Sequence, residues 1–335
     1  YQENTNGTNN SYNKWIWNAS AKYKVTDDVM AYATAGSSFR LGSGSTPLIL
    51  ARAMSLSTIV DPVLQAMSVN APETSKSYEV GFKSTWMDKK VTLNVAAFHQ
   101  DFKGFIYSTA KVYVIPNTGT LTSFVAGVPT LTLSGVAVPA PAKVDGVEAE
   151  LGFRPSSNFS IGVNLAYAKS KMKANIPCNP SVAGVPTVAD IQGSTTPNTN
   201  QVFTCAVDQS AARTAPFSGN LQAEYSHPVS DGVDGFVRAL VNYNGNSKND
   251  PSITFDDVPS YALGNLYLGV RAPNGAWEVT AYGKNIFNTF RVLTRDASAA
   301  TITTSLGTKL SNYRVISTTD PREFGITARF AFGSR

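Results

Sequence analysis

The sequence predicts an all-β fold, an antiparallel sheet that forms part of a transmembrane β-barrel. Three observations predict it: apolar and polar residues alternate repeatedly, tight turns alternate with long loops, and charged residues are few. Charged residues make up 15% of the 335 residues, against about 25% in an average soluble domain. No run of about 18 apolar residues is present, so a membrane-spanning helix is excluded and strands must do the crossing.

Alternation with a period of two is the dominant pattern. In its clearest case, near the end of the chain, every second residue is apolar: Phe324, Ile326, Ala328, Phe330 and Phe332. Strict alternation places the two sets on opposite faces of a strand. The pattern recurs and predicts eleven strands, near 14–23, 29–36, 77–86, 91–102, 144–153, 159–168, 216–226, 235–244, 261–271, 277–287 and 323–332.

The connections between these strands alternate in length. The short ones are Lys24–Asp28, Met87–Lys90, Pro155–Asn158, Pro228–Asp234 and Pro273–Ala276. The long ones are roughly 36–76, 103–143, 169–215, 245–259 and 288–322. Loops this long are uncommon in compact domains, whereas short periplasmic turns and long extracellular loops are typical of outer-membrane barrels.

Most of the predicted strands hold about ten residues, the length that a tilted strand needs to cross a bilayer. Eleven is an odd number, and single-chain bacterial barrels close with an even one. We therefore expect further strands from sequence outside this chain. The chain also opens at Tyr1 without an apolar signal core, which predicts a mature or trimmed fragment.

The chemistry of the bilayer assigns the two faces. Apolar sets face hydrocarbon, because no water is present there to solvate polar groups. Aromatic residues near the strand ends are expected in the interfacial girdles. The opposite face carries mixed charge, which predicts a wide, hydrated or plugged lumen. The residues proposed to face a plug in that lumen are Glu148, Glu150, Glu224, Arg238, Arg271 and Arg329.

The two cysteines lie in one stretch rich in Pro, Ser, Thr and Asn. Neither Cys178 nor Cys205 belongs to a CxxC motif, and no histidine is near them. This arrangement predicts a disulfide within one extracellular loop, formed in an oxidising compartment.

Several motifs resemble the C-terminal barrel half of TonB-dependent outer-membrane receptors. Pro72-Glu73 followed by Tyr78-Glu79-Val80-Gly81-Phe82-Lys83 is similar to one strand of that family. Similar family segments, in the family's order, are Asp145-Gly146-Val147-Glu148-Ala149-Glu150, Gly283-Lys284-Asn285-Ile286-Phe287-Asn288 and Asp320-Pro321-Arg322-Glu323-Phe324-Gly325. Each motif alone is a weak signal, but the four motifs in the family's order and spacing together make a strong signal that extends over nearly the whole chain.

The resemblance implies a fold and a set of partners. This chain would supply about the last eleven strands of a barrel of roughly 22, a size that encloses a plug. The expected partners are the N-terminal plug and barrel half of the same receptor, TonB with ExbB and ExbD, and outer-membrane lipid and lipopolysaccharide. The plug, the TonB-contacting segment and the earlier strands are not in this sequence. Gly333-Ser334-Arg335 follow Phe332, where the family's chains usually end.

Enzymatic and metal-dependent functions find little support in the residues. The two histidines, His99 and His227, lie on distant strands without partners at metal-ligand spacing. Glu148 and Glu150 are more readily explained as plug contacts than as an acid–base pair, because no cleft accompanies them. We expect no enzyme, no catalytic residue, no cofactor, no metal site and no nucleic-acid partner.

The resemblance implies energised uptake of a scarce nutrient across the Gram-negative outer membrane. A passive porin-like channel shares the alternation and the loops but needs neither plug nor TonB. A barrel enzyme would need a nucleophile with a histidine partner, and a structural or adhesive barrel would show no ligand-dependent growth phenotype. The sequence leaves the substrate open among siderophores, cobalamin and glycans.

Charge favours an anionic ligand, with a ferric siderophore as the leading candidate. The five long loops hold sixteen Lys and Arg against nine Asp and Glu, a net of +7, whereas the whole chain is +5. A positive vestibule attracts anions, although basic residues there also suit lipopolysaccharide phosphates, and a neutral glycan or cobalamin is the alternative. The proposed ligand-binding residues are Arg40, Arg52, Tyr107, Lys111, Tyr113, Arg213, Arg291, Arg295, Tyr313 and Arg314.

Overall fold

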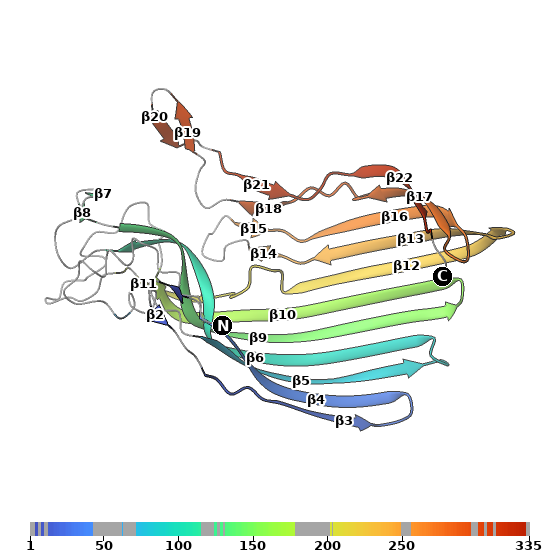
Figure 1. Ribbon diagram of the computed structural model, residues 1–335, viewed down its shortest axis with the longest axis horizontal. Helices are drawn as coiled ribbons and strands as arrows, with labels where there is room; N and C mark the ends of the chain where they lie inside the picture. The colour runs from blue at the N-terminus through green and yellow to red at the C-terminus, as the bar shows by residue number, and fades with distance from the viewer. Residues whose placement is uncertain are drawn as a thin grey trace.

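The computed structural model consists of antiparallel strands (Figure 1). The residues that it describes are 13–42, 72–114, 131–177, 204–248, 256–295, 301–304, 307–310 and 313–332, with short pieces at 4–5, 8–9, 62, 124–125, 128–129 and 202. Within these residues, no helix is long and apolar enough to cross a membrane.

Eleven strands form one continuous sheet, in which each strand pairs with its neighbours in the order given in the next sentence. They are β3 (Asn18–Lys24), β4 (Val29–Arg40), β5 (Glu73–Trp86), β6 (Val91–Val114), β9 (Leu131–Ser156), β10 (Phe159–Pro177), β12 (Phe217–Ser230), β13 (Val233–Asn244), β16 (Tyr261–Arg271), β17 (Trp277–Lys284) and β22 (Glu323–Phe330). The short β11 (Thr204–Gln209) adds to the outer part of β10. The predicted antiparallel fold is thus confirmed. In the described sheet β3 and β22 are edge strands, so the chain forms a partial barrel.

The remaining strands form small two-stranded pieces outside the main sheet. They are β1 (Asn4–Thr5) with β2 (Thr8–Asn9), β7 (Phe124–Val125) with β8 (Val128–Pro129), β14 (Ser247–Lys248) with β15 (Asp257–Val258), β18 (Val292–Arg295) with β21 (Ile316–Thr318), and β19 (Thr301–Thr304) with β20 (Gly307–Leu310). Most lie in the long connections, at the end of the sheet opposite the tight turns (Figure 1).

The tight turns gather at the other end of the sheet (Figure 1). Two of them depend on glycine in the left-handed region, Gly232 at φ +70° and Gly275 at φ +68°. A third, between β5 and β6, places Met87, Asp88 and Lys89 at φ +54° to +66°. Left-handed residues match the twist of paired strands in short hairpins, which is why such turns hold the register tightly.

Register separates the side chains into two chemically different faces. We call the face that carries Glu150 the inward face, because a hollow lined by residues from β4 to β13 opens on it and the sheet therefore curves around it. Asn94, Asn164 and Asn220 share this face with Glu150. The outward face carries the alternate residues, which are apolar through the middle of every strand, such as Leu151, Val163 and Leu221.

The outward apolar residues are not covered by another layer. Ile326 is 78% exposed, Leu268 60% and Phe330 59%. In a β-sandwich these side chains would be buried against a second sheet. Exposed apolar surface of this extent marks contact with a membrane or a large partner. Phe324, Ile326 and Phe330 lie outward and Arg329 inward, opposite Glu278, as the alternation predicts.

Two of the predicted long loops are wrong in their bounds. β6 and β9 stay paired far beyond the expected strand ends, to the pair Val114 and Leu131, so much of 103–143 is a projecting hairpin. β10 likewise continues to Pro177, with β11 beside it, inside the expected loop 169–215. Pro139 and Pro141 make this part of β9 difficult to predict as a strand from the sequence, because proline is depleted in paired strands.

Polarity reverses between the two faces where the hairpins project. In β10, outward Leu165 and Tyr167 give way to outward Lys169, Lys171 and Lys173, which are exposed. On the inward side, β10 residues become buried and apolar, with Met172 0% and Ile176 4% exposed. A small core forms there with residues of β6 and β9: Tyr107, Val138, Ala140 and Ala142. The apolar band therefore ends near Tyr167.

Candidate functional site

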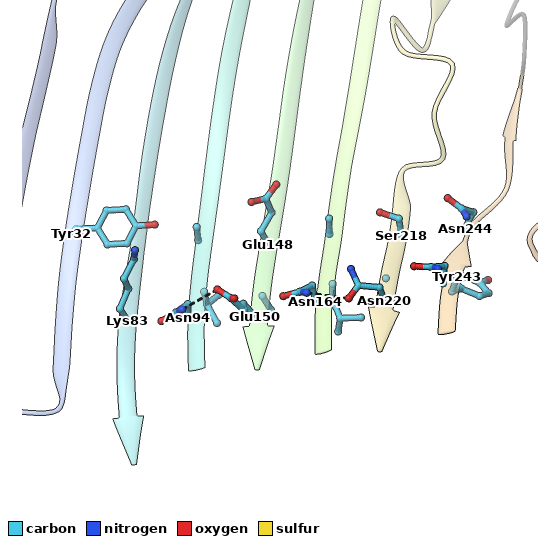
Figure 2. A pocket seen from close by; sticks show the side chains of 17 residues that line it. Tyr32, Lys83, Asn94, Glu148, Glu150, Asn164, Ser218, Asn220, Tyr243 and Asn244 are labelled. Atoms are coloured by element: carbon cyan, nitrogen blue, oxygen red, sulfur yellow. Dashed lines mark hydrogen bonds between the residues drawn. The ribbon is translucent and has the colours of Figure 1, made fainter. Parts of the chain in front are cut away.

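The most distinctive inward feature is a row of polar side chains that crosses the sheet at one level. Register places six residues directly opposite one another on successive strands from β5 to β13, namely Lys83, Asn94, Glu150, Asn164, Asn220 and Asn242. Asn94 Nδ2 donates to Glu150 Oε2 at 3.1 Å, and Asn164 Nδ2 donates to Asn220 Oδ1 at 3.0 Å (Figure 2). The row resembles a side-chain ladder in which neighbours satisfy one another's polar groups.

A second row of inward residues lies two residues along each strand from this ladder. The two rows together line a hollow of about 730 Å³. Tyr32 and Glu148 stand at this level and frame the hollow (Figure 2). Between them the opposed positions are small, Gly81 and Ala96, and the Tyr32 ring lies over Gly81. The Tyr32 hydroxyl donates to Glu79 Oε1 at 2.8 Å. This wall is a concave polar surface with amide, carboxylate and ammonium groups.

A charged cluster continues the inward wall on β12, β13 and β16. Glu224 accepts hydrogen bonds from Arg238 Nε at 2.6 Å and from an Arg271 terminal nitrogen at 2.8 Å. Both guanidinium groups lie over the ring of Phe236, at 5.3 Å and 5.0 Å from its centroid. The two guanidinium groups share one carboxylate and are also held by cation–π contact, while Asp234 and Glu278 stand directly opposite Arg271 in register and add negative charge beside them.

The six residues proposed to face a plug all lie inward. Glu148 and Glu150 line the hollow, while Glu224, Arg238 and Arg271 form the charged cluster. Arg329 stands at the β22 edge, opposite Glu278. Their contact with a plug stays a prediction. Sequence reasoning missed the asparagine ladder, although the parity of Asn94, Asn164 and Asn220 in their strands already pointed to one wall.

Two of the proposed ligand-binding arginines are engaged within the chain. An Arg40 terminal nitrogen lies 2.6 Å from Glu73 Oε2, at the outer end of β4 and β5. Arg295 lies 3.6 Å from a carboxylate oxygen of Asp256, whose side chain is 1% exposed. Arginines that neutralise internal carboxylates have little charge left to attract a ligand.

Three of these candidates, Arg291, Arg295 and Arg314, are brought together on the β18–β21 hairpin. Arg295 is paired with Ile316, two residues after Arg314, and the backbone N–H of Arg291 donates to Thr319 Oγ1 at 3.1 Å. A further hydrogen bond joins an Arg291 terminal nitrogen to the Phe290 carbonyl at 2.8 Å.

The other proposed ligand-binding residues are dispersed. Tyr107 is buried, and its hydroxyl accepts a hydrogen bond from Gln209 Nε2 at 3.0 Å. Arg213 and Tyr313 are exposed. Arg52 and the side chains of Lys111 and Tyr113 lie outside the described residues. The ligand-binding assignment of this set stays a prediction.

The charge count that favoured an anionic ligand needs correction. Six of the sixteen basic residues assigned to the long loops lie on the outward side, namely Lys76, Lys103, Lys143, Lys169, Lys171 and Lys173. Asp208, opposite Lys173, belongs to the same side. Ten basic residues against eight acidic ones remain for the rest of these loops, so most of the excess does not face a vestibule.

The histidines and cysteines do not extend the inward site. His99 faces outward beside Tyr78, and its ring nitrogens lie 2.6 Å from Asp145 and 3.1 Å from Asp101. In the described part of the chain, no group of three potential metal ligands gathers and no cysteine is a free thiol. Cys178 lies outside that part, so its disulfide with Cys205 stays a prediction.

Comparison with known proteins gives the same architecture. A family model described as TonB dependent receptor-like, beta-barrel, matches residues 1–286. No curated protein sequence matches the chain. Similar solved structures include the ferric yersiniabactin uptake receptor FyuA of Yersinia pestis, with 16% identity, a TM-score of 0.58, and 94% of this chain and 37% of that chain covered.

Two further receptors have the same relation to this chain. The ferric-catecholate import receptor Fiu of E. coli K12 shows 17% identity and a TM-score of 0.56, with coverage of 95% and 35%. The siderophore receptor PiuA of Acinetobacter baumannii shows 16% identity and a TM-score of 0.53, with coverage of 93% and 35%. At these identities the likeness establishes the fold. The chain spans little more than a third of the length of each receptor.

Proposed function

The chain belongs to the TonB-dependent receptor family, and on that premise we propose that it forms about half the barrel wall of an active transporter in a Gram-negative outer membrane. The observation that carries this proposal is the contrast between the two faces. The outward face is an exposed apolar band, whereas the inward face carries the asparagine ladder and the Glu224 cluster. A sheet of this kind is suited to separate lipid from a hydrated or plugged interior.

The partners follow from the inward wall. Fixed carboxylates, amides and guanidinium groups, such as Glu150, Asn220 and Arg238, suit a polar protein surface better than an empty pore, because their hydrogen-bonding capacity is only partly used within the wall. We assign that surface to a plug in the same receptor. TonB, energised through ExbB and ExbD, would act on the plug to open a path for the ligand.

A ferric siderophore is the leading ligand. This choice now rests on the similar structures, whose names describe uptake of ferric yersiniabactin and import of ferric catecholates, and no longer on the net charge of the loops. Among the proposed ligand-binding residues, Arg213, Arg291 and Arg314 are the described arginines on which contact with an anion from the outside would then depend.

A neutral ligand is the second candidate, and two observations favour it. The outward lysines account for most of the basic excess of the long loops. Arg40 and Arg295 are paired with Glu73 and Asp256. A glycan or cobalamin receptor would need no positive vestibule, so this internal neutralisation is compatible with a neutral nutrient.

The experiment is a transport assay with the full-length receptor that contains this chain. It is produced in a strain that lacks its own siderophore receptors, and uptake of a panel of radiolabelled ferric siderophores is measured beside labelled cobalamin. The assay is repeated with a protonophore and in a strain without TonB. We expect saturable uptake of one ferric siderophore that both treatments abolish.

Other results would separate the alternatives. Uptake that persists without TonB and with the protonophore would contradict active transport and point to a passive channel. Energy-dependent uptake of cobalamin alone would leave the transporter assignment standing and overturn the siderophore. Membrane fractionation in the same strains gives an independent readout of location.

A further inference from the structure

The outward surface just beyond the apolar band carries an unusual concentration of lysines. Register places Tyr78, His99, Asp145 and Lys169 in one row across β5, β6, β9 and β10. The next row on the same face lies two residues further along each strand, away from the tight turns, and consists of Lys76, Asp101, Lys143 and Lys171. Two residues of strand span roughly 7 Å. The ammonium groups therefore begin with Lys169, in the row that holds Tyr78, and continue roughly 7 Å further along the strands with Lys76, Lys143 and Lys171.

These lysines surround a hollow rather than a flat patch. Its volume is about 840 Å³, and its lining includes Lys76, Lys103, Lys143, Lys171 and Lys173. Trp15 and Trp17 form another side of it, and both are exposed, at 82% and 43%. Tryptophan prefers the interface between hydrocarbon and headgroups, so the hollow combines cationic groups with side chains typical of that depth.

Only part of this positive charge is neutralised within the chain. Lys143 lies 3.2 Å from Asp101, and Lys171 lies 3.1 Å from Asp208. Lys76, Lys103 and Lys173 make no ion pair with any acidic side chain in the described part of the chain. Among the described residues, the hollow therefore presents three ammonium groups whose charge no carboxylate offsets.

The direction of the lysines decides what that partner is. Lys171 and Lys173 point away from the inward core that contains Met172, so a nutrient in the vestibule does not reach them. The surface below them is the exposed apolar band, which includes Val80 at 59% and Val147 at 47% exposed. A ligand that contacts both regions has phosphate groups next to acyl chains, as a membrane lipid has.

We propose that this hollow is a binding site for the phosphate groups of a glycolipid in the outer leaflet, the lipid A part of lipopolysaccharide. The acyl chains would lie along the apolar band of β4, β5 and β6, and the phosphates would accept hydrogen bonds from Lys76, Lys103 and Lys173. The inference depends on the proposed membrane location but not on the proposed transport, because the site lies on the opposite side of the wall from the ligand path.

The test measures lipid retention by the full-length receptor. The receptor is purified in detergent, mixed with diphosphorylated lipid A or with its dephosphorylated counterpart of the same acyl composition, and examined by native mass spectrometry. The variant carries Lys76→Gln, Lys103→Gln and Lys173→Gln. We expect wild-type receptor to retain the diphosphorylated lipid, and the variant to bind it about tenfold to a hundredfold more weakly, since each lysine near a charged surface contributes to attraction.

Two matched variants keep the test decisive. Lys24→Gln, Lys89→Gln and Lys90→Gln change the net charge equally, but these lysines lie in or next to the tight turns at the other end of the sheet, so lipid binding should not change. Lys76→Arg, Lys103→Arg and Lys173→Arg keep the charge and should keep binding, which separates loss of charge from misfolding.

Equal retention of phosphorylated and dephosphorylated lipid would overturn the proposal, as would an equal loss in the tight-turn variant. Uptake of the transported nutrient, measured in parallel, should be unaffected by the Lys76, Lys103 and Lys173 changes. Failure of transport therefore does not count against the lipid site, and failure of the lipid site does not count against transport.

Discussion

Tyr32 lies across Gly81: the two residues stand directly opposite each other on β4 and β5, and a methyl group at Gly81 would lie 2.8 Å from the tyrosine ring. The same ring donates its hydroxyl proton to Glu79, two residues before the glycine. Tyr282, Gly325 and Glu323 repeat the arrangement on β17 and β22. Two motifs of the family resemblance thus share a Glu-x-Gly unit, in which the tyrosine of the neighbouring strand lies over the glycine and donates its hydroxyl hydrogen to the glutamate.

The close contact between the Tyr32 ring and Gly81 predicts that Gly81→Ala destabilises the barrel. The new methyl group would also lie 2.5 Å from the Val95 carbonyl oxygen, so backbone as well as ring must shift, at a cost of about 1–3 kcal/mol typical of overpacking. The measurement is urea unfolding of the full-length receptor. Gly162→Ala is the control, because a methyl group there meets nothing within 4 Å. An equal loss at Gly162 would show that the ring contact is irrelevant.

The Glu224 cluster predicts a stability effect that does not depend on ligand. Glu224→Gln removes the carboxylate that holds Arg238 and Arg271, whose side chains are 29% and 26% exposed. Glutamine keeps one carbonyl oxygen but carries no charge, so two partly buried cations lose their counter-charge, which should cost about 1–3 kcal/mol of unfolding free energy. Asp27→Asn breaks the pair of Lys24 and Asp27, which is exposed, and should give no measurable change. Similar results for both variants would contradict the structural role of the cluster.

Asn285 predicts a folding defect at the outer end of β17. Its side chain donates to the Thr289 and Asp320 carbonyls and accepts from the Thr289 N–H, all at 2.9 Å, and its φ is +46°. Asn285→Ala should cost about 3 kcal/mol, because buried backbone groups lose their partners. Heat-modifiable mobility of the full-length receptor on gels reports the loss of folded barrel.

The matched variant is Asn288→Ala. Asn288 also has a positive φ, +52°, so alanine brings similar backbone strain. Its backbone N–H, which alanine retains, bonds to the Asn285 carbonyl. Folded barrel should therefore survive in this variant. If both variants fail alike, the left-handed backbone rather than the hydrogen bonds of Asn285 is what matters.

The predicted Cys178–Cys205 disulfide has a direct chemical test. Peptide mapping of the full-length receptor without reductant should yield one linked peptide that contains both residues. Cys205→Ser should lower stability by about 3 kcal/mol on chain-entropy estimates for a loop of this size. Recovery of both cysteines as alkylated free thiols, from a sample never reduced, would contradict the pairing.

The sequence alone determined the strands and their faces through the apolar band. In β10, the alternation of Ile161, Val163 and Leu165 with polar or small residues is local and strict, because successive side chains of a strand point to opposite faces. In the proposed membrane location, lipid would reinforce this signal, since it tolerates only apolar side chains on one face. Sequence reasoning therefore placed Glu150 and Arg238 on the correct wall without knowledge of their neighbours.

The tertiary structure decided what lies beyond that band. Beyond the apolar band, water can solvate either face, so the sequence of β6 and β9 no longer separates strand from loop or inward from outward. Only pairing shows that Lys171 faces out while Met172 is buried, and that Arg40 is neutralised by Glu73. A net charge summed along loops therefore misjudged the vestibule. Composition is additive along a chain, but the face on which each charge lies is set by contacts with strands distant in sequence.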